Sequence, residues 1–188
     1  DAVVGYNIGG AISGTRMLFE AGFHRIACVS GPERVETAQE RAEGWRQAVI
    51  SATGAPPAPE LLRQMEFTVA GGEQATRELL DLPEPPDAIF AANNKLSTGV
   101  LRVLTQRGLM PPRTGVMAFG GLPLVVLAPI GILVTHLPAR ELGLQAAAML
   151  LERIEGLSSP AREIVLPVVI SNEDEGLSLI DGRVGAYG

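Results

Sequence analysis

The sequence predicts an α/β fold built on a doubly wound parallel sheet. Short apolar runs alternate with longer segments of helical periodicity along most of the 188 residues. Continuous apolar runs are typical of parallel strands that helices cover on both faces, and single helices between them indicate right-handed βαβ units. Aromatic residues make up only 4% of the chain, so aliphatic side chains must build the core.

The expected strands are short, and all but the third are rich in aliphatic residues. They are residues 2–6, 25–30, 64–68, 87–92, 115–119, 130–135 and 164–170.

The expected helices lie between these runs, at residues 9–21, 36–51, 72–82, 94–107 and 138–156. The second places Trp45 and three smaller apolar residues on one face. The fourth ends before Gly108, a usual C-terminal stop, and the last begins with Pro138, which suits a first helical turn. Residues 53–59 (TGAPPAP) are expected to form a surface connection.

Charge and cysteine content restrict the class of protein. A net charge of −6 disfavours direct binding to nucleic acid, because such binding relies on Lys and Arg at the phosphates. The single Cys28 excludes an intramolecular disulfide and favours a reducing compartment. The most apolar stretch, residues 122–134, contains two prolines and is too short to cross a bilayer. Because the chain begins at Asp1 without Met, we expect a fragment or a processed form.

In sheets of this kind, ligands bind beyond the carboxyl ends of the strands. This rule selects the segments that follow the expected strands, before any family is considered. They are residues 6–10, 30–35, 67–70, 93–95 and 120–122.

Several local patterns follow one another in a recognisable order. They are GTRMLFEAGFHRIACVSGP (14–32), ERAEGWRQAV (40–49), PPDAIFAANN (85–94), VMAFGG (116–121) and LVTHLPARELGLQAAAMLLERIEG (133–156). Taken together, these patterns resemble the LacI/GalR family of transcriptional regulators, and the resemblance covers roughly residues 3–170.

The resemblance implies a two-subdomain core like that of type I periplasmic binding proteins, and a helix-turn-helix headpiece outside this chain. Residues 1–21 would end the N-terminal subdomain, and residues 22–135 would form the C-terminal, effector-binding subdomain. Residues 136–160 would return to the N-terminal subdomain, and residues 161–188 would form a closing strand and tail.

Three residues match positions of the family that commonly meet the ligand. Arg41 matches an arginine whose rigid fork of donors grips sugar hydroxyls, although a solvated arginine paired with Glu40 or Glu43 is the alternative. Asn93 matches an amide that meets ligand hydroxyls. The alternative is that Asn93 caps the following helix, and a third arrangement has Asn93 in the cleft and Asn94 as the cap. Phe67 matches an aromatic wall for a sugar ring or a base, or else it is a core residue.

The sequence departs from the family at the edge of the expected cleft. Gly120 and Gly121 stand where the family typically has an acidic acceptor for sugar hydroxyls, and Leu137 stands at an often polar position. These changes make the cleft less polar and favour a less hydroxylated effector, such as a purine-like or aromatic metabolite, or a loss of response.

The apolar segment 122–133 predicts either core or an interface, because large exposed apolar patches are uncommon on soluble monomers. Family members dimerise partly through this region and the helix at 94–107. We therefore expect a dimer interface around Leu124, Leu127 and Ala128, with burial under a loop as the alternative.

The sequence gives little support for a catalytic site or a cofactor site. His24 and His136 are far apart in sequence, and no HExxH, CxxC or GxSxG motif occurs, so neither a metal site nor a nucleophile is expected. The glycines of residues 5–14 follow a strand, but their spacing is not GxGxxG. We expect close packing there, no cofactor and no enzyme activity, and a glycine-rich nucleotide enzyme is the least favoured class.

The sequence thus predicts the effector-binding and dimerisation portion of a cytoplasmic LacI-family regulator. A sugar-like or purine-like metabolite would control operator binding by the headpiece, with no contact to a membrane. The alternative is a periplasmic sugar- or solute-binding protein of a transporter. The upstream sequence distinguishes them, because a helix-turn-helix indicates the first and a signal peptide the second.

Overall fold

The structure, a computed structural model, describes residues 1–122 and 131–172. The predicted interface residues Leu124, Leu127 and Ala128 lie outside the described residues. The strands are β1 (Ala2–Gly5), β2 (Ile26–Ser30), β3 (Leu62–Gln64), β4 (Ala88–Ala91), β5 (Gly115–Phe119), β6 (Ile132–His136), β7 (Glu163–Leu166) and β8 (Val169–Asn172). The helices are α1 (Asn7–Glu20), α2 (Glu36–Thr53), the short 3-10 helix η1 (Pro59–Leu61), α3 (Val69–Leu80), α4 (Asn94–Arg107) and α5 (Ala139–Ile154).

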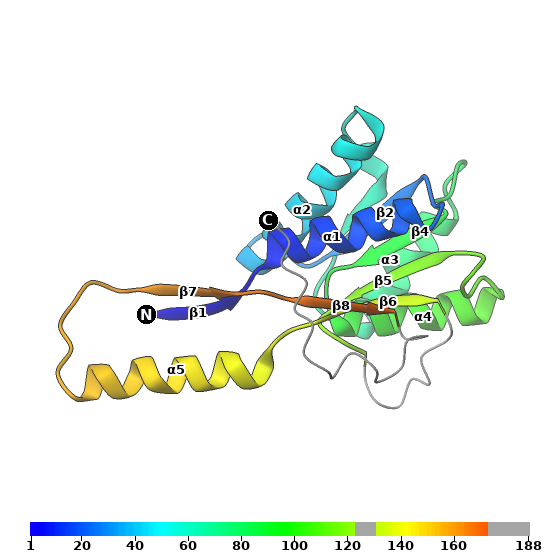
Figure 1. Cartoon of the computed structure of the whole chain (residues 1–188). Coiled ribbons are helices and arrows are strands. Elements are labelled where there is room, and N and C mark those ends of the chain that lie inside the picture. The colour runs from blue at the N-terminus through cyan, green and yellow to red at the C-terminus, as the bar shows by residue number, and fades with distance from the viewer. Residues whose placement is uncertain (123–130, 173–188) are drawn as a thin grey trace.

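Most of the chain forms one unit, the body, around a sheet in the order β3-β2-β4-β5-β6-β8. Neighbouring strands run parallel, except that β8 lies antiparallel to β6. Helices α1 and α2 pack together, as do α3 and α4, and Figure 1 shows α1 and α4 on opposite sides of the sheet. The doubly wound α/β prediction is confirmed, with an antiparallel edge strand that the sequence did not indicate.

The middle strands of the sheet form the centre of the core. Every residue of β2, β4 and β5 is buried. Trp45 of α2 packs into this core, and its indole N–H donates to the carbonyl oxygen of Ile26 at 3.2 Å. Helices on both faces remove the need for alternating polar residues, which explains the continuous apolar runs in the sequence.

Helix α1 packs on the body, against α2 and the sheet, although the prediction from sequence grouped it with β1 in residues 1–21. Small residues allow it to lie close to its neighbours. A Cβ on Gly44 of α2 would lie 2.4 Å from the carbonyl oxygen of Ile8, and one on Gly14 would lie 2.3 Å from Cε of Met117 in β5. These close approaches fix α1 between α2 and the sheet.

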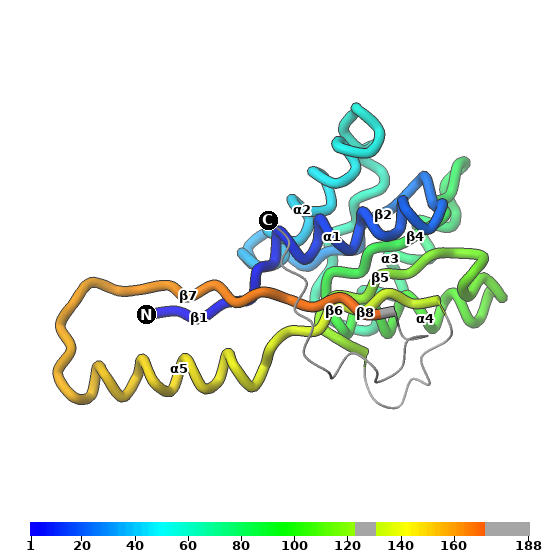
Figure 2. The backbone as a smooth tube through the Cα atoms, viewed as in Figure 1, coloured from blue at the N-terminus to red at the C-terminus, as the bar shows by residue number. Residues whose placement is uncertain are grey.

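A second unit, the arm, consists of β1, β7 and α5 and extends away from the body (Figures 1 and 2). Strand β1 pairs in parallel with β7, and α5 packs against β1. Met149 is the buried residue of α5. The arm leaves several large apolar side chains exposed: Leu144, Leu150, Leu151, Ile154 and Val165.

Within the described residues the chain crosses between arm and body three times, at residues 5–7, 136–139 and 166–169. These crossovers meet, because a Cβ on Gly5 would lie 3.0 Å from Cδ2 of Leu137 and 3.5 Å from Cγ1 of Val168. The prediction of a single strand at residues 164–170 is wrong. The segment forms two strands, β7 of the arm and β8 of the body, and they are separated around Pro167, which lacks an N–H for strand pairing.

The third strand is shorter and earlier than the predicted residues 64–68. It covers Leu62–Gln64, and α3 begins at Val69 rather than at residue 72. The hydroxyl of Thr68 accepts from the N–H of Gly71 at 2.9 Å, which caps the helix. Residues 65–68 are therefore the turn between the two elements.

Candidate functional site

The polar residues predicted to meet a ligand lie near the carboxyl edge of the body's sheet. Arg41 is in the second turn of the helix that follows β2, and Asn93 comes two residues after the end of β4. Phe67 lies in the turn after β3. Parallel strands bring these segments to the same edge, as the rule for ligand sites in such sheets requires.

The side chain of Arg41 is buried, with 9% of its surface exposed, so the alternative of a solvated arginine is wrong. Its Nε donates to Oδ1 of Asn7 at 2.9 Å, and its Nη1 donates to the carbonyl oxygen of Ala92 at 2.7 Å. The guanidinium carbon lies 4.2 Å from the centre of the Phe119 ring. Segments from α1, α2, β4 and β5 therefore converge on one guanidinium.

Asn7 is the site residue that the sequence reasoning missed. It is 4% exposed in the first turn of α1, and its Nδ2 donates to Oε2 of Glu40 at 2.7 Å. The amide thus bridges the Glu40 carboxylate and the Arg41 guanidinium. The available signal was its position directly after an expected strand, within the segment 6–10 selected by the edge rule.

The charge of Arg41 lacks a direct counter-charge. Burial lowers the pKa of its guanidinium to about 10, and the Glu40 carboxylate opposes this shift. The group therefore stays cationic at neutral pH. Glu43, the other partner considered from sequence, pairs with Arg46 instead.

Asn93 is the N-cap of α4, which begins at Asn94, so the alternative in which Asn94 caps the helix is wrong. Its Oδ1 accepts from the N–H groups of Lys95 at 2.7 Å and of Leu96 at 3.3 Å. The acceptor side of the amide is thereby occupied. Because Asn93 follows Ala92, whose carbonyl binds Arg41, these two predicted residues lie at neighbouring points of the edge.

Phe67 is half-buried and packs against the core. Its ring covers the segment after β2, because a Cβ on Gly31 would lie 2.2 Å from Cζ of Phe67. The position at the carboxyl edge is compatible with a wall for a ligand ring. That role stays a prediction.

The two glycines after β5 adopt backbone conformations that other residues rarely take. Gly120 has φ 89° and Gly121 has φ 84°. Both N–H groups donate to the carbonyl oxygen of Thr135, at 2.9 and 3.0 Å. The turn therefore offers a ligand neither a side-chain acceptor nor a free N–H.

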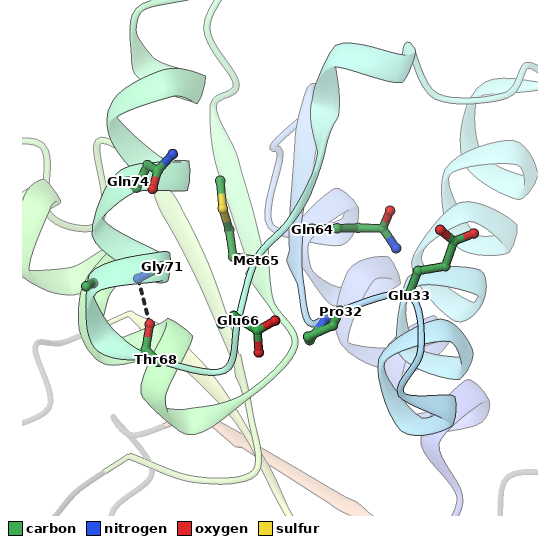
Figure 3. Close-up of a pocket in the computed structure, with 9 residues that line it drawn as sticks. Pro32, Glu33, Gln64, Met65, Glu66, Thr68, Gly71 and Gln74 are labelled. Atoms are coloured by element: carbon green, nitrogen blue, oxygen red, sulfur yellow. Dashed lines mark hydrogen bonds between the residues drawn. The ribbon is translucent and has the colours of Figure 1, made fainter.

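A separate cavity of about 530 Å³ lies between the start of α3 and the segment after β2 (Figure 3). In Figure 3 the Glu66 carboxylate lies between Thr68 and Pro32, and Glu66 is paired with Arg34. The lining residues are Pro32, Glu33, Gln64, Met65, Glu66, Thr68, Ala70, Gly71 and Gln74, so none of the predicted ligand residues lines it.

The described residues hold no group of three or more His, Cys, Asp or Glu side chains that could bind a metal ion. Cys28 is buried, and burial raises the pKa of its thiol well above the usual range, which Arg46 opposes. Within the same residues, no helix is both long and apolar enough to span a membrane.

A family model described as a periplasmic binding protein-like domain matches residues 15–172. The chain belongs to this family. Within it, the chain is similar to transcriptional regulators. It is 29% identical over 151 residues to the HTH-type transcriptional repressor CytR of Escherichia coli K12, covering 80% of this chain and 44% of CytR.

The chain is also 31% identical over 171 residues to the HTH-type transcriptional regulator CelR of Thermobifida fusca, covering 90% of this chain and 50% of CelR. A solved complex of the transcriptional regulator CelR with cellobiose has a TM-score of 0.81 at 32% identity and covers 90% of this chain and 52% of that one. The resemblance to the LacI/GalR family is thereby confirmed. The chain spans about half the length of these curated relatives.

Proposed function

We propose that this chain is the effector-binding part of a LacI-family transcriptional regulator, with its ligand at the carboxyl edge of the body's sheet. The relatives support this, since CytR and CelR are regulators and the solved CelR complex carries cellobiose. A solute-binding protein of a transporter has the same fold class, but the relatives named above favour a regulator.

The observation that carries this proposal is a line of contacts from Arg41 to the crossovers. A Cβ on Gly10 of α1 would lie 3.0 Å from Cε2 of Phe119 and 2.5 Å from Cγ2 of Val168. Phe119 is the ring beneath Arg41, and Val168 lies in the crossover between β7 and β8. A ligand that displaces Arg41 or Phe119 therefore acts on a segment that joins body and arm.

This arrangement supports allosteric control. A ligand that binds one orientation of arm and body more tightly shifts the population toward that orientation. In the whole protein, which we place in the cytoplasm, a helix-turn-helix headpiece outside these residues would contact operator DNA. Residues 22–135, together with α1, would be the effector-binding subdomain, and the arm would belong to the other one. No catalytic role is proposed.

Arg41, Asn93 and Phe67 are the proposed ligand-binding residues. Nη2 of Arg41 and Nδ2 of Asn93 have no hydrogen-bond partner in the described part of the chain, so both are available as donors. Phe67 would provide the apolar wall. Asn7 would hold the guanidinium in place without meeting the ligand.

The proposed dimer interface comprises Leu124, Leu127 and Ala128. Sedimentation velocity of the chain tests it. The wild type should form dimers at micromolar concentration, and Leu127→Asp should shift the population toward monomers. A wild type that remains monomeric would remove these residues from the interface.

The test of the whole proposal is the coupling between ligand and operator in the full-length protein. Its operator is first found by binding-site selection, and its affinity is then measured with and without candidate effectors, cellobiose first. An effector should change the affinity by a factor of about 5–150, the usual range of allosteric coupling. A molecule that binds the body yet leaves operator affinity unchanged would contradict the regulatory role.

A further inference from the structure

Arg41 is the one charged residue among the buried side chains that the structure describes. No ion pair joins it to a carboxylate anywhere in residues 1–122 and 131–172. Its two recorded acceptors, Oδ1 of Asn7 and the carbonyl of Ala92, are neutral. Buried charges in proteins are normally paired, so this guanidinium lacks the partner that its position calls for.

The unpartnered part of Arg41 is accessible. Among the described residues, the only fully buried side-chain nitrogen or oxygen without a hydrogen bond is Oγ1 of Thr15. Nη2 of Arg41, which has no partner, is therefore not sealed inside the body. Its charge is compensated only at a distance by Glu40, whose carboxylate binds the bridging amide of Asn7.

Two groups beside this guanidinium have their acceptors in use and donors to spare. Oδ1 of Asn93 is used by the cap of α4, whereas its Nδ2 has no partner among the described residues. The carbonyl of Ala92 already accepts from Nη1 of Arg41, whereas Nη2 has no partner in the same part of the chain. A sugar hydroxyl both donates and accepts, whereas an anionic group only accepts, which matches these two unused donors.

We propose that the ligand of this site carries an anionic group, a carboxylate or a phosphate, that binds Nη2 of Arg41 and Nδ2 of Asn93. This inference rests on the proposed function, because it names the chemical class of the effector. Arg suits such a group, since its charge-assisted hydrogen bonds to carboxylate and phosphate oxygens are short and strong.

Inorganic phosphate tests the proposal directly on the full chain. The Nε–H signal of Arg41, assigned by its loss in Arg41→Gln, is followed by ¹⁵N NMR as phosphate replaces chloride at constant ionic strength. We expect a saturable shift of this signal. Phosphate affinity should fall about tenfold or more in Arg41→Gln, the scale of one lost charge-assisted contact. It should stay unchanged in Arg102→Gln, a surface arginine paired with Glu73.

Glucose and gluconate extend the test from phosphate to a carboxylate, because gluconate carries a carboxylate and glucose does not. An Arg41 signal that phosphate and gluconate both leave unmoved would overturn the inference, as would undiminished phosphate binding by Arg41→Gln. If Arg41→Gln fails to fold, Arg41→Lys replaces it as the variant. In that case the titration of the wild type with phosphate still shows whether an anion binds at Arg41. Movement of the signal by cellobiose alone would overturn the inference and leave the proposed function standing.

Discussion

The guanidinium carbon of Arg41 lies 4.2 Å from the centre of the Phe119 ring, and this contact fixes the candidate site to the core. Phe119 in turn packs edge-on against Phe90, with ring centroids 6.3 Å apart and planes inclined by 75°. A cation over an aromatic face is stabilised by about 0.5–2 kcal/mol, more when water is excluded. The site is therefore held by the hydrophobic core and by the ends of strands.

Phe119→Leu should separate the packing of this ring from its contact with Arg41. We expect a loss of about 1–3 kcal/mol in the free energy of unfolding, measured by urea denaturation, because a fully buried ring is truncated. Phe90→Leu is the matched control, since that ring is equally buried and makes the same edge contact. Only Phe119→Leu should speed the hydrogen exchange of the Arg41 Nε–H. Equal exchange in both variants would contradict the contact.

Asn7→Ala should destabilise the chain by about 1–3 kcal/mol, because it leaves the buried Nε–H of Arg41 without an acceptor. Glu40→Gln is the control, since its side-chain carbonyl can still accept from Asn7, and its effect on urea denaturation should be smaller. A Glu40→Gln variant that loses as much as Asn7→Ala would show that charge, rather than the hydrogen-bond bridge, holds the guanidinium.

The sequence predicted most elements of the body because their signals are local. The apolar runs of β2, β4 and β5 and the Gly108 stop of α4 depend on neighbouring residues alone. The placement of α1 depended instead on how closely its backbone approaches Gly44 of α2, which no periodicity shows. The division between β7 and β8 depended on Pro167. The two strands on either side of it belong to different sheets, which the sequence around Pro167 does not show.

The site was predicted only in part for the same reason. Asn93 lies at a position that the edge rule and the family resemblance both select, whereas Arg41 was selected by the resemblance alone. Asn7 joins the site through partners more than thirty residues later in the chain, Glu40 and Arg41, and no short motif records such a pairing. The cap at Asn93 shows that one amide can serve the helix with its oxygen and leave its nitrogen free.

Gly44→Ala and Gly143→Ala should have opposite effects on thermal stability. A Cβ on Gly44 would lie 2.4 Å from the backbone oxygen of Ile8, so we expect overpacking to cost about 1–3 kcal/mol. Nothing lies within 4 Å of a Cβ on Gly143 in α5, so alanine should stabilise the helix by about 0.5–1 kcal/mol. A Gly44→Ala variant that melts above the wild type would contradict the close packing of α1 on α2.

Cys28 should react slowly with iodoacetamide in the folded chain. Burial raises the pKa of its thiol, so the reactive thiolate stays rare as the pH increases. We expect the labelling rate to remain nearly flat between about pH 7 and 9, where a free thiol with a pKa near 8.5 accelerates. Labelling in urea provides the unfolded reference. A folded-state rate that rises with pH as the reference does would show that the thiol is exposed.

The central claim is that a small molecule binds beside Arg41 at the carboxyl edge of the sheet. It is tested most directly by thermal unfolding of three proteins, the wild type, Arg41→Gln and Arg102→Gln, against one library of neutral and anionic metabolites. We expect compounds that stabilise the wild type to stabilise Arg102→Gln as well and to lose their effect on Arg41→Gln. Compounds that stabilise the wild type and Arg41→Gln equally would place the ligand elsewhere.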